Sequence, residues 1–210
     1  MKDGSCTVGK LKSEVIEMCR RKGWGDDGIQ NPQHVAMAML VETMELMEHF
    51  VDLDETGERA LISGLDQAEI TEIAEELADV LMYALQLMYT LNVDISASVS
   101  PDFSDGATTV EKLRKSVGGC VGGLKEQVMR AGIKGRFVLE AFQWMDDGQV
   151  TALTRGEMPG KCAEAGRAFA DMFRELLCLA NMLDIDISRA IARKIAIVDR
   201  RVYPEDDPVR

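Results

Sequence analysis

The stretch LVETMELMEHF (residues 40–50) combines a strongly apolar helical pattern with regularly spaced carboxylates. From residue 35 to residue 51 most positions are apolar, yet Glu42, Glu45 and Glu48 recur at every third position. Positions three and four apart share one face of a helix, so Glu42 falls inside the apolar stripe and Glu45 lies at its margin. Because an isolated buried carboxylate is costly, this stretch predicts a helix whose carboxylates are paired or bind a metal.

A second acidic strip runs through AEELADVLMYALQLM (residues 74–88). Glu72, Glu76 and Asp79 follow one another at helical spacing, and residues 80–93 carry no charge. Either strip alone is typical of a solvated helix face, but two strips on neighbouring apolar helices predict one shared cluster. Carboxylates without His or Cys favour Mg²⁺, or Mn²⁺ in its place, over zinc. The predicted metal ligands are Glu42, Glu45, Glu76 and Asp79.

Charge and cysteine content limit the classes of partner and location. A net charge of −12 argues against a nucleic acid polymer or an anionic membrane, because both require a basic surface. Five cysteines without a CxxC pair indicate neither a disulfide framework nor a zinc site. The first ten residues lack an apolar leader, and the uncharged run at 80–93 is too short to span a bilayer. We expect a soluble, cytoplasmic protein.

Helical periodicity dominates the whole chain, so the predicted fold class is all-α. All five prolines lie beside expected turns, and no run of alternating β-branched residues competes. The glycine-rich GGCVGG (residues 118–123) lacks phosphate-loop spacing and favours close helix packing or a helix interruption. The predicted helices are Thr7–Arg21, Pro32–Leu53, Gln67–Leu91, Thr109–Met129, Arg136–Met145, Lys161–Leu183 and Ile187–Arg201.

The chain contains an internal repeat at an offset of 92 residues. Residues 48–96 align with residues 140–188 without a gap, and fifteen of the forty-nine pairs are identical. Two unrelated amphipathic helices could share a period, but that alternative does not explain turn matches such as Gly64 with Gly156 or Asp54 with Asp146. We therefore predict a helical bundle of two tandem copies, residues 1–100 and 101–210, that form a pseudo-dimer within one chain. The predicted linker is residues 96–106.

The first copy resembles the MazG-type all-α nucleoside triphosphate pyrophosphohydrolases. The resemblance lies in ExxE at residues 42–45 and ExxD at residues 76–79, and extends through KGW (22–24), NPQHVAMAMLVE (31–42) and EELADVLMYALQLMYTLNVDI (75–95). It implies Mg²⁺-dependent hydrolysis of a (deoxy)nucleoside triphosphate to the monophosphate and pyrophosphate. The carboxylates of the two motifs would hold the metal. Glu45 is also a catalytic candidate, and either Glu48 or Glu72 would accept a proton from the attacking water.

The second copy departs from this pattern. At the same offset Glu42 corresponds to Lys134, Glu45 to Phe137 and Glu76 to Ala168, so a complete metal site is not expected there. FQW (142–144) is similar to an aromatic element of deoxycytidine-triphosphate-preferring relatives, and residues 186–204 resemble the family's closing helix. The second copy either borders the substrate or serves as scaffold. The substrate-binding candidates over both copies are Trp24, Trp144, Lys134, Arg136, Arg193 and Lys194.

The function that we expect is pyrophosphohydrolysis in nucleotide house-cleaning or pool control, with a pyrimidine deoxynucleotide as the expected substrate. A homodimer is also compatible with the resemblance, because members of the family usually assemble from single copies, with each active site bordered by a neighbouring copy. A rival hypothesis is a catalytically silent, nucleotide-binding regulatory protein. A second rival is a purely structural helical module, which would show no Mg²⁺-dependent nucleotide binding.

Overall fold

The computed structural model describes residues 1–202, which form ten helices and no strand. The all-α prediction is therefore confirmed for this part of the chain. Tyr203 and Pro204, which end the segment that resembles a family closing helix, lie outside the described residues. The helices are α1 (Val8–Lys22), α2 (Pro32–Val51), α3 (Glu55–Ile62), α4 (Gln67–Thr90), α5 (Ile95–Val99), α6 (Val110–Ser116), α7 (Leu124–Glu140), α8 (Asp147–Thr154), α9 (Pro159–Met182) and α10 (Ile187–Arg200).

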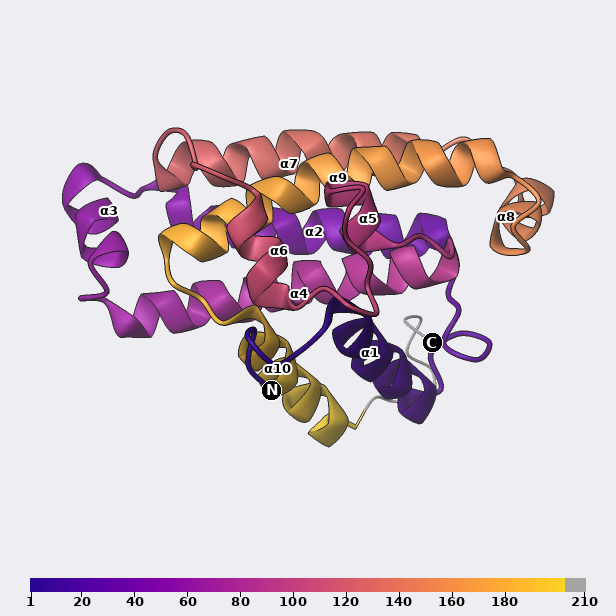
Figure 1. Ribbon diagram of the computed structural model, residues 1–210, viewed down its shortest axis with the longest axis horizontal. Coiled ribbons are helices and arrows are strands. Elements are labelled where there is room, and N and C mark those ends of the chain that lie inside the picture. The colour runs from indigo at the N-terminus through magenta and orange to yellow at the C-terminus, as the bar shows by residue number, and fades with distance from the viewer. Residues whose placement is uncertain (203–210) are drawn as a thin grey trace.

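Four long helices form the bundle. α2 packs against α4, α7 packs against α9, and the two pairs meet where α2 contacts α7 (Figure 1). The short helix α3 connects the first pair at one end of the bundle, and α8 connects the second pair at the opposite end. α1 and α10 lie together against α4 on one side. Buried apolar residues from both halves of the sequence form one continuous core.

Capping residues set most helix starts. Asn31 accepts a hydrogen bond from the Gln33 backbone N–H, and Pro32 occupies the first turn of α2, where its missing donor costs nothing. Asp54 and Asp146 cap α3 and α8 in the same way, each accepting from the backbone N–H three residues later. These two short helices were not predicted, although their capping aspartates are visible in the sequence.

The prediction of helices at Thr109–Met129 and Arg136–Met145 was wrong. The first predicted helix is interrupted after Ser116, and α7 begins at Leu124. Gly118, just after the end of α6, and Gly122, just before the N-cap of α7, adopt φ values of 76° and 87° that a helix cannot include. The helix interruption at residues 118–123 is thus confirmed. α7 then continues through Gly135, where an added Cβ would lie 3.2 Å from Met172 Sδ on α9. Close packing of α7 on α9 explains this glycine.

Two further helix boundaries differ from the prediction. Residues 141–146 turn rather than continuing a helix, and α5 occupies the first part of the predicted linker 96–106. The two longest helices match well: α4 begins at the predicted Gln67 and α9 begins two residues before the predicted Lys161.

The two halves contain the same elements in the same order. α3 and α8 begin 92 residues apart, as do α4 and α9. The halves also exchange reciprocal backbone hydrogen bonds beside the isolated bridge of Thr7 with Thr109: Val8 N–H donates to Thr108 O at 3.0 Å, and Val110 N–H donates to Cys6 O at 2.9 Å. Equivalent positions therefore contact each other across the bundle.

None of the helices within residues 1–202 combines the length and the apolar character that crossing a membrane requires.

Candidate functional site

The two acidic strips meet where α2 packs on α4. Glu42 and Glu45 lie one turn apart on α2, and Glu76 faces them from α4. One carboxylate oxygen from each of the three lies within 4.8 Å of the others. The local sequence explains this convergence, because apolar residues around each glutamate bury the α2 and α4 faces against one another and place partly buried Glu42 and Glu76 beside exposed Glu45.

Asp79 lies one turn beyond Glu76 on α4 and contacts a cation. Its Oδ2 forms an ion pair with Lys194 Nζ from α10. Lys194 is only 8% exposed although it is a lysine, so its stem packs into the α4–α10 contact while its ammonium reaches the carboxylate. The fourth predicted ligand is thereby positioned next to a predicted substrate-binding residue.

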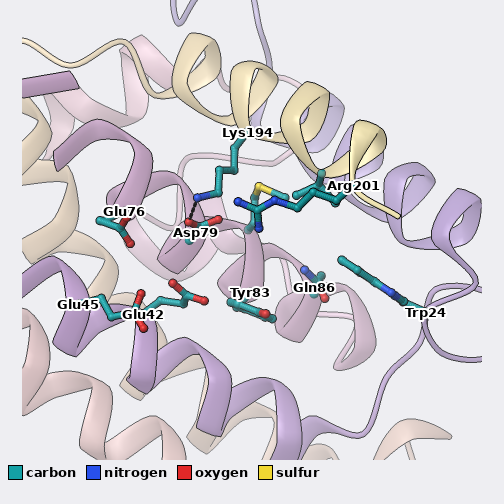
Figure 2. Close-up of a pocket in the computed structure, with 11 residues that line it drawn as sticks. Trp24, Glu42, Glu45, Glu76, Asp79, Tyr83, Gln86, Lys194 and Arg201 are labelled. Atoms are coloured by element: carbon teal, nitrogen blue, oxygen red, sulfur yellow. Dashed lines mark ion pairs between the residues drawn. The ribbon is translucent and has the colours of Figure 1, made fainter. Parts of the chain in front are cut away.

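A pocket of about 280 Å³ joins these groups (Figure 2). Its acidic end lies between α2 and α4, and Lys194 and Arg201 of the α10 segment approach from the opposite side. Trp24, which follows α1, lies at the other end. The lining residues are Trp24, Glu42, Glu45, Glu76, Asp79, Met82, Tyr83, Gln86, Lys194, Val198 and Arg201.

The carboxylates perturb one another strongly. Burial raises the pKa of Glu42 to about 7, with further increases from the neighbouring charges of Asp79, Glu45 and Glu76. Burial also raises the pKa of Asp79, while the hydrogen bond and charge of Lys194 act in the opposite direction. This concentration of negative charge would be stabilised by a cation bound between α2 and α4.

The donor set fits a hard divalent cation. Glu76 Oε2 is buried and has no hydrogen-bond partner among the described residues, so one oxygen is held out of water without compensation. Glu42 and Glu45 provide further oxygens close by, and oxygen ligands are those that Mg²⁺ prefers. The residues present therefore suit the Mg²⁺ that the two motifs predict.

A second acidic group adjoins the first. His49 Nδ1 lies 2.7 Å from Glu69 Oε1, and a Glu72 oxygen lies within 4.8 Å of both. Glu48 lines a neighbouring groove of about 560 Å³ together with Glu45 and Glu76. Of the two predicted proton acceptors, Glu48 lines this groove, which His49 and Glu69 also line, whereas Glu72 does not line it. Sequence reasoning did not identify His49 or Glu69, although His49 follows Glu45 at helical spacing.

The two predicted cations of α10 lie in different environments. Lys194 lines the pocket, but Arg193 points elsewhere and pairs with Glu75 at 2.8 Å. Arg201 also lines the pocket; it is one of the cations of the terminal segment that could contact phosphates, although it was not among the six substrate-binding candidates. Tyr83 and Gln86 were also missed, although they continue the helical spacing of Glu76 and Asp79 along α4.

The equivalent region of the second half is a separate groove of about 360 Å³ between α7 and α9. Lys134, Phe137 and Asp171 line it, and Asp171 pairs with Arg174 at 3.0 Å. Its other carboxylates are also paired along their own helices: Glu164 with Lys161 at 2.9 Å, and Glu140 with Arg136 at 3.4 Å. The charge of this groove is therefore balanced without a metal.

Trp144 lies outside both of these pockets. It is 86% exposed in the turn after α7, and it is absent from the linings of the acidic pocket and of the groove between α7 and α9. Lys134 and Arg136 likewise belong to the second half and do not line the acidic pocket. Within one chain, Trp24 and Lys194 line the same pocket as the metal candidates, and the other four predicted substrate residues do not.

Comparisons of this chain with protein-family models, with curated proteins and with solved structures found no match.

Proposed function

We propose that this protein is a Mg²⁺-dependent nucleoside triphosphate pyrophosphohydrolase that acts at the pocket between α2, α4 and α10. The observation that carries the proposal is the convergence of Glu42, Glu45 and Glu76, with the unpartnered Glu76 Oε2, opposite Lys194. A polyphosphate needs a cation between itself and such carboxylates, and a second positive group on its far side. One pocket contains both the carboxylates that would hold such a cation and, in Lys194, a positive group opposite them.

The residues of the chain have separable roles in this reaction. Mg²⁺ bound by the carboxylates would supply charge neutralisation at the phosphates and would acidify a water molecule. Lys194 and Arg201 would bind phosphate oxygens and orient the chain of phosphates along the pocket. Glu48, which shares the neighbouring groove with Glu45 and Glu76, is the better placed of the two proton acceptors. Cleavage between the α- and β-phosphates then gives the monophosphate and pyrophosphate.

We also propose that the chain is a duplicated pseudo-dimer with one site. The equal spacing of α3 with α8 and of α4 with α9 supports duplication, as do the reciprocal hydrogen bonds beside Thr7 and Thr109. Such self-complementary contacts are typical of a two-fold interface. In this scheme residues 1–100 hold the metal, and residues 101–210 contribute α10 to the pocket and otherwise act as scaffold.

A second copy of the chain is the proposed protein partner. Met37 and Val41 on α2 are each more than half exposed, and Met129 and Ile133 on α7 are 49% and 56% exposed. Because α2 and α7 are in contact, these side chains provide apolar area for a dimer contact. Sedimentation velocity with the variant V41E/I133E tests this assignment, since the pair of charges should shift a dimer to monomers.

The setting that we propose is control of the nucleotide pool in the cytoplasm, with a deoxynucleotide as substrate. The five cysteines are all free thiols, which suits a reducing compartment. The alternative is a regulatory protein that binds nucleotide and Mg²⁺ without turnover. The unpartnered Glu76 Oε2 is compatible with both functions, so turnover must be measured.

The test is incubation with Mg²⁺ and each common or damaged nucleoside triphosphate, with pyrophosphate and orthophosphate measured separately. Equal amounts of pyrophosphate and monophosphate from a few substrates would support the proposal. Release of orthophosphate would contradict the proposed cleavage position. Mg²⁺-dependent nucleotide binding without any product would favour the regulatory alternative, and absence of both binding and product would leave only a structural module.

A further inference from the structure

The pocket contains a buried polar side chain that the metal chemistry does not use. Gln86 is 3% exposed and lines the pocket on the same strip of α4 as Glu76, Asp79 and Tyr83. Its Oε1 is buried and has no hydrogen-bond partner among the described residues. An unpaired buried amide oxygen is destabilising relative to an apolar side chain of similar shape, so its presence requires a reason.

The position of Gln86 along α4 suggests that reason. Gln86 follows Asp79 by seven residues, which corresponds to about 10 Å along a helix axis. Phosphates bound by Lys194, beside Asp79, would therefore leave the nucleoside directed toward Gln86. Figure 2 shows the Gln86 amide between the side chains of Tyr83 and Trp24, at the end of the pocket away from Glu76.

On the basis of the proposed nucleotide hydrolysis, we propose that Gln86 reads the nucleobase edge and sets base specificity. A carboxamide presents one acceptor and two donors in a plane, so it forms paired hydrogen bonds with a base edge that carries a donor beside an acceptor. Trp24 and Tyr83 supply aromatic surface for the base, and such surface alone accepts every base. Discrimination between bases must therefore come from Gln86, the amide side chain among the described lining residues.

The unpaired atom of Gln86 constrains the edge of the base that can bind beside it. The atom left without a partner is an acceptor, so the base must donate to it. The amino group of cytosine and the ring N–H of uracil or thymine both satisfy this requirement.

Two substitutions test the assignment. Gln86→Leu keeps the approximate size of the side chain and removes both hydrogen-bonding groups. We expect the ratio of kcat/KM between the preferred pyrimidine triphosphate and dATP to fall about tenfold to a hundredfold, as for loss of one paired contact with a base. Gln86→Glu leaves only acceptors, so it should shift preference toward dCTP over dUTP, because cytosine offers an amino donor where uracil offers an oxygen.

Thr90→Val is the matched control. Thr90 lies one turn further along α4, is 5% exposed, and also has a buried, unpartnered oxygen, but it does not line the pocket. Both Gln86→Leu and Thr90→Val should keep or raise Tm, because each removes an unpaired buried polar atom. Only Gln86→Leu should alter base selectivity. An unchanged selectivity ratio in Gln86→Leu, or an equal change in Thr90→Val, would overturn the assignment.

A binding measurement separates the role of Gln86 from the proposed reaction. The shift in Tm with Mg²⁺ and the α,β-methylene analogues of dCTP, dUTP and dATP reports base preference without turnover. If the wild-type protein releases no pyrophosphate but binds one pyrimidine analogue selectively, and Gln86→Leu loses that selectivity, the proposed reaction fails and the role of Gln86 stands. If the protein turns over but Gln86→Leu keeps the wild-type selectivity, the reaction stands and the role of Gln86 fails. Binding without base preference in the wild-type protein also overturns the role of Gln86.

Discussion

Asp3 and Asp105 hold equivalent helix starts in opposite halves of the chain. Asp3 Oδ1 accepts a hydrogen bond from the backbone N–H of Ser188 at 2.7 Å, and Asp105 Oδ1 accepts one from the backbone N–H of Ser96 at 2.8 Å. Each aspartate thereby joins its own half to the first turn of α10 or α5 in the other half. For Asp3 this contact positions α10, the helix that carries Lys194 into the candidate site.

Removing one of these anchors should destabilise the whole bundle. Asp105 is buried and pairs with Lys12 at 2.6 Å, so Asp105→Asn leaves a largely buried lysine without its counter-charge. We expect the free energy of unfolding at pH 7 to fall by about 3 kcal/mol, as for other broken buried pairs. Urea unfolding measures the loss, and Asp102→Asn in the same loop between α5 and α6 is the exposed control.

The pH dependence of that loss has a defined sign. Burial alone would raise the pKa of Asp105, but Lys12 and the backbone N–H of Ser96 lower it below the ordinary value of 3.8. The carboxylate therefore stabilises the fold above about pH 4, and this contribution disappears as the pH falls through the lowered value. The difference between the wild-type protein and Asp105→Asn should shrink below pH 4. An undiminished difference at pH 2–3 would exclude the ion pair as its source.

Asp79 and its equivalent Asp171 provide a matched test of the single-site proposal. Asp79→Asn should lower kcat/KM about 100-fold or more, because metal-assisted charge stabilisation contributes several kcal/mol. Asp171→Asn removes an exposed carboxylate that pairs with Arg174 on its own helix, and activity should stay within about twofold. Circular dichroism would verify the fold of both. Equal losses in the two variants would contradict a single metal site.

Substitutions of Trp24 and Trp144 should affect substrate binding differently. Trp24 is 9% exposed and lines the pocket, so Trp24→Leu should raise KM about tenfold through lost stacking on the base. Trp144→Leu should leave KM unchanged in a monomer, because this side chain lies outside the pocket. A selective rise in KM for Trp144→Leu would instead indicate that a neighbouring copy supplies Trp144 to the site. Steady-state kinetics at several protein concentrations distinguishes these cases.

Strong periodicity explains why the long helices could be predicted. α4 and α9 each contain 24 residues with a sustained apolar face, and their starts were predicted within two residues. α3, α5 and α8 contain eight residues or fewer, too short for a periodic pattern to be recognised. Their aspartate caps were the available signal, and it was not used.

The metal candidates could be predicted because their spacing within α2 and α4 is local. Gln86 extends the strip of Glu76 and Asp79, yet a glutamine within an apolar run resembles an ordinary core position until its unpaired oxygen is known. Which cations of the α10 segment reach the pocket depends on how α10 crosses α4, which no local pattern specifies. The acidic end of the pocket, Trp24 and Lys194 were therefore accessible from sequence, whereas Tyr83 and Gln86 required the structure.

Glu42 makes stability depend on pH and on Mg²⁺. Its pKa of about 7 lies above the ordinary value of 4.5, so between these values the carboxyl is protonated in the folded chain and ionised in the unfolded chain. Its contribution to stability is therefore complete below about pH 4.5 and is lost as the pH rises through 7. After solvent screening of this partly exposed group, we expect the metal-free Tm to be about 2–4 °C lower at pH 8 than at pH 6.

Mg²⁺ should reverse that loss, because binding to the ionised carboxylates stabilises only the folded chain. At a hundredfold excess over Kd, linkage contributes about 2.7 kcal/mol, and the shift should be larger at pH 8 than at pH 6. Glu42→Gln should abolish both the pH-dependent step and the Mg²⁺ shift, while Glu157→Gln, an exposed control, should preserve them. Differential scanning calorimetry with and without Mg²⁺ measures all three proteins. A Mg²⁺ shift that survives in Glu42→Gln would remove this residue from the metal site, because the stabilisation would then come from other carboxylates.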